Sequence, residues 1–261
     1  MIIKHELQEN RKSLLIWALS VGISSALCIL LYESVADSIK EIAYLYQDMG
    51  GISKALGMDK VSIATLGGYY SAEIALIYSI GAAMFSAMLG ISLLSKEEEA
   101  HTAEFLFSLP ISRQHIFWKK YLSILILLIL FNVIAITPEY LALYKVGMPF
   151  NYIDFAQYHS LVLVMQVEIA SICFMISAFS RKKLVGLGMG IALFGYFMDL
   201  ICRLVDKVDI LKYVTPYYYA NATDRFAGSD LDVVMLLIAT VIIIISDLIG
   251  LFVFSRRDLA S

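Results

Sequence analysis

The stretch SKEEEAHTAEFLFSLPISRQHIFWKK, residues Ser95–Lys120, is polar and lies between two long apolar runs. It carries three consecutive carboxylates, from Glu97 to Glu99, and a proline at Pro110. A polar segment between two apolar runs is typical of a connection at a membrane surface, because the runs cross the hydrocarbon while the connection stays in water. The sequence therefore predicts a chain that folds in a membrane around this connection.

Composition points to the same class of protein. Of the 261 residues, 60% are hydrophobic and 16% are charged, and the mean hydropathy is +0.77. These values are typical of a polytopic membrane protein. The net charge of −3 and the lack of a basic stripe argue against a nucleic-acid partner. Cys28, Cys173 and Cys202 lie in apolar runs without metal-ligand spacing, so we expect packing thiols and no metal site.

Six apolar runs are long enough to cross a membrane as helices. They are residues 14–32, 74–94, 117–144, 160–179, 184–204 and 233–254. The polar residues 1–13 predict an interfacial helix that leads into the first run. The predicted fold is thus an all-α polytopic membrane protein, a single domain over 1–261, with loops at 33–72, 95–116 and 205–231.

The distribution of basic residues predicts the orientation. Six spans place both termini on one side of the membrane. Lysine and arginine are concentrated in the termini, in the 95–120 connection and in the SRKKL tract at 180–184. By the positive-inside rule, these segments and both termini are expected in the cytoplasm.

The central connection itself has helical features. In EEEAHTAEFLFSL, the residues Ala103, Phe105, Leu106 and Leu109 form an apolar face, and the leading glutamates complement the helix dipole. Pro110 ends this predicted helix, and Ser112 is placed to cap the next one. We expect a short helix across the cytoplasmic mouth of the bundle. An amphipathic interfacial loop without a partner is the alternative.

The same stretch resembles the cytoplasmic loop of ABC-2 type transporter permeases, whose pattern is close to EExxGTxExLLSLPISRxxIxxxK. The matching residues are Glu97, Glu98, Thr102, Glu104, Leu106, Ser108, Leu109, Pro110, Ile111, Ser112, Arg113, Ile116 and Lys119 or Lys120. His101 stands where the pattern has glycine, so the local turn there can differ. KHELQENRKSLLIWAL, LGMDKVSIATLGGYYSAE and FSRRDL are similar to the family's elbow helix with first span, its extracellular segment before span two, and its chain end.

This resemblance implies the permease subunit of an ATP-driven exporter with a type V-like fold. Two permease chains, identical or related, would pair with two cytoplasmic ATP-binding subunits in the plasma membrane, and a coupling helix would dock in a cleft of each. The coupling residues implied are Glu97, Glu98, Glu99, Thr102, Glu104, Phe105, Leu106, Leu109, Pro110 and Arg113. Residues 205–231 would form short extracellular re-entrant helices.

No catalytic signature is present, and the chain lacks the GxxxxGK[ST] phosphate-binding loop. We therefore expect no enzyme activity and no cofactor in this chain, with ATP and Mg bound by the partner subunit. Charged residues inside spans are costly, which makes Glu139, Glu168 and Asp247 candidates for lining a pathway. A structural role, satisfied by hydrogen bonds, is the alternative for each. Asp199 and Arg203 are four residues apart and predict a helical ion pair.

The sequence does not name the cargo. Apolar, aromatic-rich spans with few carboxylates favour a peptide or lipid-like amphipathic compound over a bare ion. A sodium or drug exporter of the same family remains an alternative, as does a sensor or regulatory subunit that engages an ATPase without transport. An intramembrane hydrolase is disfavoured because no paired His/Glu or Ser/Lys motif lies in the spans.

Overall fold

The computed structural model describes residues 2–47, 50, 53, 58, 60–102 and 111–257, and these residues contain helices and connections but no strand. In chain order the elements are α1 (Ile2–Gln47), α3 (Leu66–Tyr69), η1 (Tyr70–Ile74), α4 (Ala75–Leu93), α5 (Lys96–Glu99), α7 (Arg113–Val146), α8 (Tyr152–Phe179), α9 (Val185–Leu204), η2 (Asp206–Tyr213), α10 (Pro216–Tyr219), α11 (Ala222–Phe226) and α12 (Val233–Arg256).

Six helical stretches are long and apolar enough to cross a membrane. They are Ile2–Glu41, Leu66–Leu93, Arg113–Val146, Tyr152–Phe179, Val185–Leu204 and Val233–Arg256. This result confirms the predicted all-α fold with six candidate transmembrane helices.

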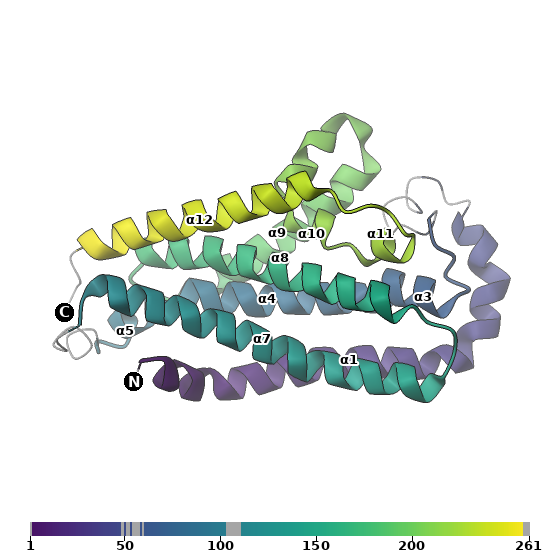
Figure 1. Ribbon diagram of the computed structural model, residues 1–261, viewed down its shortest axis with the longest axis horizontal. Coiled ribbons are helices and arrows are strands. Elements are labelled where there is room, and N and C mark those ends of the chain that lie inside the picture. The colour runs from purple at the N-terminus through teal and green to yellow at the C-terminus, as the bar shows by residue number, and fades with distance from the viewer. Residues whose placement is uncertain are drawn as a thin grey trace.

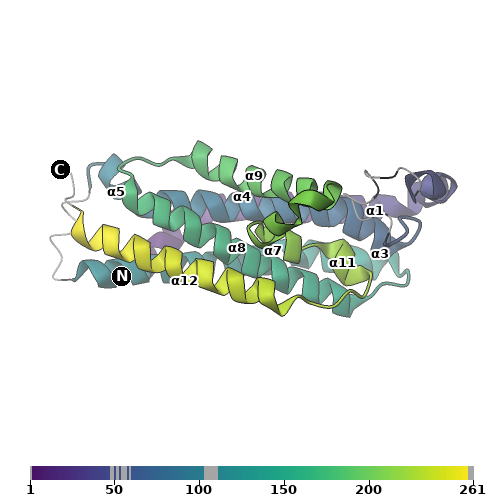
Figure 2. The same cartoon turned by 90° about the horizontal axis from the view of Figure 1, so that it is seen from above.

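The long helices lie side by side in an elongated bundle (Figures 1 and 2). The start of α1, the end of α12 and the short helix α5 lie at one end, which we call the terminal end. The short helices α3 and α11 lie at the opposite, far end. The predicted polar connection after span two therefore lies at the same end as both termini.

Helices α4 and α8 form the centre of the bundle. The most apolar 18-residue stretch is 67% buried in α8 and in the span that contains α4, but only 22% buried in α9 and in α12. α4 packs on α8, α12 packs on the other side of α8, and α1 packs on α7. A β-carbon built on Gly90 would lie 2.4 Å from the carbonyl oxygen of Ala170, so α4 and α8 are in backbone contact. Ala82, Ser86 and Gly90 recur every four residues on α4 and form a small-residue face that permits this close packing.

The first helix differs from the expected division into an interfacial helix, a span and a loop. α1 continues from Ile2 through position 13 and past position 32 to Gln47. Residues 2–21 contain neither glycine nor proline, so nothing in the backbone favours a break there. The last part of α1 turns away from the bundle direction at the far end (Figure 1).

Two other helices begin earlier than predicted. α7 begins at Arg113, directly after Ser112, whose side chain accepts a hydrogen bond from the His115 amide at 3.3 Å. The predicted cap at Ser112 is thus present. α8 begins at Tyr152 because the Asn151 side chain caps the amides of Ile153 and Asp154. The segment 205–231 contains η2, α10 and α11, while their re-entrant placement in a membrane stays a prediction.

Candidate functional site

A cluster of charged side chains, most of them buried, occupies the terminal end of the bundle. It consists of Glu6 and Glu9 from α1, Lys96 and Glu97 from α5, and Lys120 from α7, and we call it the end cluster. Nζ of Lys96 lies 2.5 Å from Glu6 Oε2 and 2.5 Å from Glu9 Oε2. Nζ of Lys120 lies 3.1 Å from Glu6 Oε1 and also pairs with Glu97. Three separate helices are therefore joined at one point.

Burial makes these ion pairs energetically important. The side chains of Glu6 and Lys120 are each 1% exposed and that of Lys96 is 8% exposed. Lys120 also donates to the carbonyl oxygen of Leu93 at 2.6 Å and to Glu97, so the ammonium group has three oxygen neighbours when Glu6 is counted. Burial acts to lower the pKa of Lys96, but Glu6 and Glu9 outweigh it and raise that pKa above its ordinary value. The carboxylates of the end cluster therefore favour the charged form of Lys96.

The other two glutamates of the acidic triplet also have partners within the chain. Glu98 forms an ion pair with Arg257, which follows α12. Arg257 Nη1 donates to the carbonyl oxygens of Ala178 and Ser180, each at 2.7 Å. Glu99 lies 3.9 Å from Nζ of Lys183 in a more exposed pair. Glu97, Glu98 and Glu99 thus bind the connection to α7, to the end of α12 and to the 180–183 turn.

The connection leaves α5 through a tight turn. His101 has a φ of 54°, the left-handed conformation that glycine adopts most readily. The backbone at His101 thus has a conformation that glycine adopts without strain. Thr102 donates its backbone N–H to the carbonyl oxygen of Glu97 at 2.8 Å and is exposed. Arg113, the first residue of α7, donates to the carbonyl oxygen of Arg257 at 2.6 Å.

The remaining predicted coupling residues are Glu104, Phe105, Leu106, Leu109 and Pro110, and they lie outside the described residues. The short helix predicted from Ala103 to Leu109 is therefore untested. Both ends of this segment are held against the bundle, by Glu97–Glu99 before it and by Arg113 after it.

Glu139 occupies a second buried polar cluster, toward the far end. Its Oε2 accepts a hydrogen bond from the Tyr70 hydroxyl at 2.8 Å and lies 3.3 Å from Nε2 of His159. Tyr70 Oη and His159 Nε2 are 3.0 Å apart, which closes a triangle between η1, α7 and α8. Glu139 is 0% and His159 5% exposed. The partners of His159 are 20 and more positions away along the chain, so spacing within one helix does not reveal them.

A third polar cluster continues the same seam between α4, α7 and α8. The Tyr78 hydroxyl donates to Oδ1 of Asn132 at 2.8 Å, and the Asn132 amide donates to Gln166 Oε1 at 2.5 Å. Gln166 in turn donates to the carbonyl oxygen of Ala82 at 3.2 Å. Asn132 precedes Glu139 by seven residues, so both lie on one face of α7, about 10 Å apart along its axis.

Glu168 and Asp247 do not join these clusters. The Tyr219 hydroxyl of α10 donates to Glu168 Oε2 at 2.8 Å, which ties the 205–231 segment to α8. Asp247 on α12 is 5% exposed and lies close to Tyr121 and Ser171, while its Oδ1 has no hydrogen-bond partner among the described residues. The three candidate carboxylates therefore have three separate sets of partners at different depths of the bundle. The structure does not bring them together into one site.

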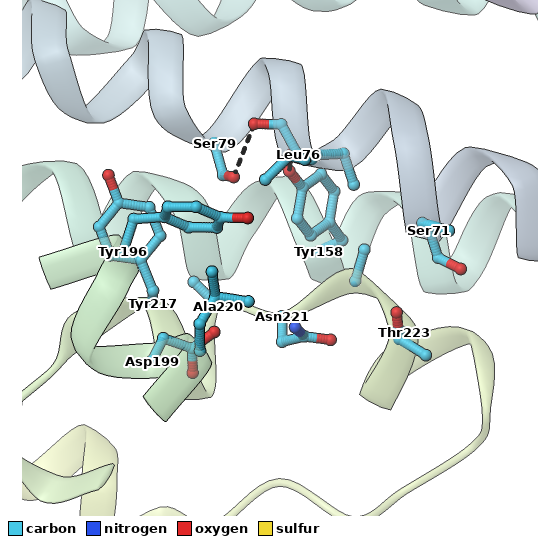
Figure 3. Close-up of a pocket in the computed structure, with 14 residues that line it drawn as sticks. Ser71, Leu76, Ser79, Tyr158, Tyr196, Asp199, Tyr217, Ala220, Asn221 and Thr223 are labelled. Carbon is cyan, nitrogen blue, oxygen red and sulfur yellow. Dashed lines mark hydrogen bonds between the residues drawn. The ribbon is translucent and has the colours of Figure 1, made fainter. Parts of the chain in front are cut away.

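A small polar cavity lies at the far end between α4, α9 and the short helices α10 and α11 (Figure 3). Its volume is about 50 Å³, which is enough for a few water molecules and too small for an amphipathic cargo. The buried hydroxyl of Tyr217 lines it and has no hydrogen-bond partner among the described residues. Asp199 also lines it and binds Nε of Arg203 at 3.1 Å, which is the ion pair predicted from their spacing.

Comparison with protein families identifies the class of protein. A family model described as ABC-2 family transporter protein matches residues 1–259. The chain belongs to the ABC-2 transporter family. No curated protein matches it.

Family membership and the six apolar helices establish a multi-pass membrane permease of an ABC transporter. Such a permease is a transport subunit and implies an ATP-binding partner chain. The described part of the ABC-2 chain contains no group of three or more metal-ligating side chains. We therefore take the end cluster with the Glu98–Arg257 pair as the candidate functional site. It lies at the start of the polar connection at residues 95–120.

Proposed function

We propose that this ABC-2 permease is the membrane half of an ATP-driven exporter, in which two permease chains work with two cytoplasmic ATP-binding subunits. The terminal end would face the cytoplasm, as the concentration of lysine and arginine there favours. ATP and Mg would bind to the partner subunits. The single observation that carries this proposal is the fixing of the connection after span two to α1, α7 and α12 by buried ion pairs.

This geometry supports a mechanical role for the connection. A segment that contacts a moving ATP-binding subunit transmits force only where it is rigidly joined to the spans. Ion pairs between buried partners resist displacement, because separating them leaves an uncompensated charge in a low-dielectric environment. Glu97 and Glu98 would therefore be positioning residues for the connection. The contact with the ATP-binding subunit would fall to residues 103–110.

The size of the far-end cavity and the exposure of α9 and α12 are relevant to the route of the cargo. The far-end cavity of about 50 Å³ is too small for a peptide or lipid-like compound. Helices α9 and α12 are largely unburied within the single chain and carry apolar side chains such as Phe194, Phe197 and Phe252. We propose that the cargo is a peptide or lipid-like amphipathic compound and that its path lies between two permease chains.

The test is co-purification from native membranes with a tagged chain, comparing wild type with a Glu104→Arg/Leu106→Asp variant. We expect the wild type to recover a P-loop ATPase and the variant to lose it at unchanged expression. The matched control is His101→Gly, which changes the same connection but suits the positive φ at that position. It should recover the ATPase like wild type. Failure of the wild type to recover any ATPase would refute the proposal.

A transport assay then separates export from regulation. In vesicles that contain the recovered complex, an exporter accumulates cargo and its ATPase rate rises with cargo. Stimulation of the ATPase without accumulation would instead establish a sensor or regulatory subunit. Formation of a sodium gradient that is insensitive to added peptides would overturn the proposed cargo class.

A further inference from the structure

An open groove runs along the outer surface of α1 and α7 near the terminal end. Its volume is about 580 Å³. It is lined by Ile3, Lys4, Leu7, Gln8, Arg11, Leu14, Leu127 and Leu130. One part of this lining carries two cations, while the rest is almost entirely aliphatic. No carboxylate lines the groove.

Charges of opposite sign lie on different faces of the first turns of α1. Glu6 faces the bundle and is paired with Lys96 and Lys120 of the end cluster. Lys4 and Arg11 are exposed on the groove side, and neither forms an ion pair with any described residue. Their spacing of seven residues places them on one face of the helix, about 10 Å apart along its axis. The groove therefore offers two uncompensated cations to an anionic partner.

The aliphatic part of the groove extends into the membrane-spanning region. Contact between Glu6 and Lys120 fixes the level of α1 relative to α7. Leu14 is eight residues beyond Glu6 on α1, and Leu127 is seven residues beyond Lys120 on α7. The two leucines therefore lie at about the same height in the bundle, well inside the apolar run of α7. Leu130 is 39% exposed and faces the outside of the bundle. A ligand that fills the whole groove must be charged at the end near Lys4 and apolar at the end near Leu130.

We propose that this groove binds an anionic phospholipid of the leaflet at the terminal end. The phosphate group would lie between Lys4 and Arg11, and an acyl chain would lie along Leu7, Leu14 and Leu130. Basic residues at a membrane interface attract anionic lipids, each contributing about 1 kcal/mol, or about a fivefold change in affinity. The inference concerns the resident lipid and not the exported cargo, and it does not depend on an ATP-binding partner.

A second copy of the chain fits the groove less well. In a twofold contact centred on the groove, the same surface of both chains is used. Lys4 and Arg11 of one copy would then lie close to the same residues of the other, with no carboxylate in the lining to compensate them. An anionic lipid removes this repulsion, whereas a second copy creates it.

The test measures binding of phosphatidylglycerol and phosphatidylcholine to the purified full chain in detergent by native mass spectrometry. We expect wild type to prefer phosphatidylglycerol, and Lys4→Gln/Arg11→Gln to lose about 30-fold in affinity for it, from two factors of about five. The control Lys12→Gln/Lys182→Gln removes the same charge from exposed residues outside the groove and should change affinity less than about twofold. Equal losses in both variants would indicate only general attraction and would overturn the proposal.

Two further variants test the shape of the site. Leu130→Trp fills the aliphatic part at unchanged charge, and we expect it to weaken phosphatidylglycerol binding severalfold. Inorganic phosphate should not compete with the lipid, and competition at equal concentration would mean a phosphate site without an acyl subsite. Gln8→Cys tests whether a second copy of the chain occupies the groove. Efficient disulfide cross-linking between two chains at this position would show a second copy in the groove and would overturn the lipid assignment.

Discussion

Nζ of Lys96 and Oε2 of Glu6 lie 2.5 Å apart, although the two residues are 90 positions apart in the sequence. The first belongs to the connection after span two and the second to the first turns of α1. Their side chains are 8% and 1% exposed, so the pair is shielded from water. Because Glu6 also pairs with Lys120, the first turns of α1 and α7 are held together at the terminal end.

Replacing Lys96 tests how much the end cluster contributes to the stability of the fold. Lys96→Met leaves Glu6 with only Lys120 and leaves Glu9 without its buried partner. We expect the free energy of unfolding to fall by about 3 kcal/mol, at the low end of the range for breaking a buried pair, because Lys120 still compensates Glu6. The measurement is reversible denaturation in detergent micelles.

The control for this prediction is Lys40→Met, which breaks the exposed pair of Lys40 with Asp37. Exposed pairs contribute little, so stability should hardly change. Equal effects at the two lysines would contradict a special role of the end cluster.

The same lysine predicts a response to alkaline pH. The pKa of Lys96 in the folded chain is raised above its ordinary value of 10.5, because Glu6 and Glu9 outweigh the opposite effect of burial. A raised pKa means that its contribution to stability is complete below the unfolded-state pKa and is lost as the pH rises through the folded-state pKa. We expect the stability difference between wild type and Lys96→Met to be constant from about pH 7 to about pH 9 and to shrink above about pH 10.5.

The measurement is a series of unfolding curves for both forms over this pH range. Lys40→Met should follow the wild-type curve at every pH. A difference that already shrinks below about pH 9 would mean that another group is responsible.

Local features of this chain were accessible from the sequence. The six spans follow from the length and hydropathy of their runs, and the Ser112 cap and the Asp199–Arg203 pair follow from spacing within one helix. These features depend on contacts between residues at most a few positions apart, or on average composition. Properties of this kind can be predicted from the residue types and their spacing along the chain.

Contacts between distant helices were not accessible in this way. The sequence did not indicate that Glu97 and Glu98 pair with Lys120 and Arg257 of this chain, and the coupling role implied for the acidic triplet stays a prediction. Nε2 of His159 lies 3.3 Å from Glu139 on another helix, a contact that the spacing of residues within α8 does not indicate. Which faces of two helices meet depends on their rotation and relative height, and neither is encoded in the periodicity of one helix alone. The polar residues in the predicted spans were the only available signal.

The buried triangle at the far end predicts a stability effect at Tyr70. Tyr70→Phe removes the hydroxyl that donates to Glu139, whose other oxygen has no partner among the described residues. We expect a loss of about 1–3 kcal/mol, the range for removing one partner of a buried acceptor, because only His159 then remains beside this oxygen. Denaturation measures it, and Tyr144→Phe is the matched control because Tyr144 is 75% exposed. An unchanged stability of Tyr70→Phe would indicate that water reaches Glu139, as expected for a residue that lines a pathway.

Gly90 of α4 and Gly190 of α9 predict opposite responses to the same substitution. A β-carbon at Gly90 would lie 2.4 Å from the Ala170 carbonyl oxygen, so Gly90→Ala must separate α4 from α8 and should cost about 1–3 kcal/mol. Gly190 has no atom of another element of the described chain within 4 Å of the same position. Gly190→Ala should leave the folded chain unchanged or stabilise it by up to about 1 kcal/mol, because alanine favours helix.

Denaturation of the two variants measures this contrast directly. Chain association, followed by cross-linking in membranes, supplies a second readout for α9. If Gly190→Ala keeps full stability but weakens association, the glycine face of α9 contacts a second permease chain. If both stability and association are unchanged, that face contacts lipid. A loss of stability at Gly190 equal to that at Gly90 would contradict the packing described for α9.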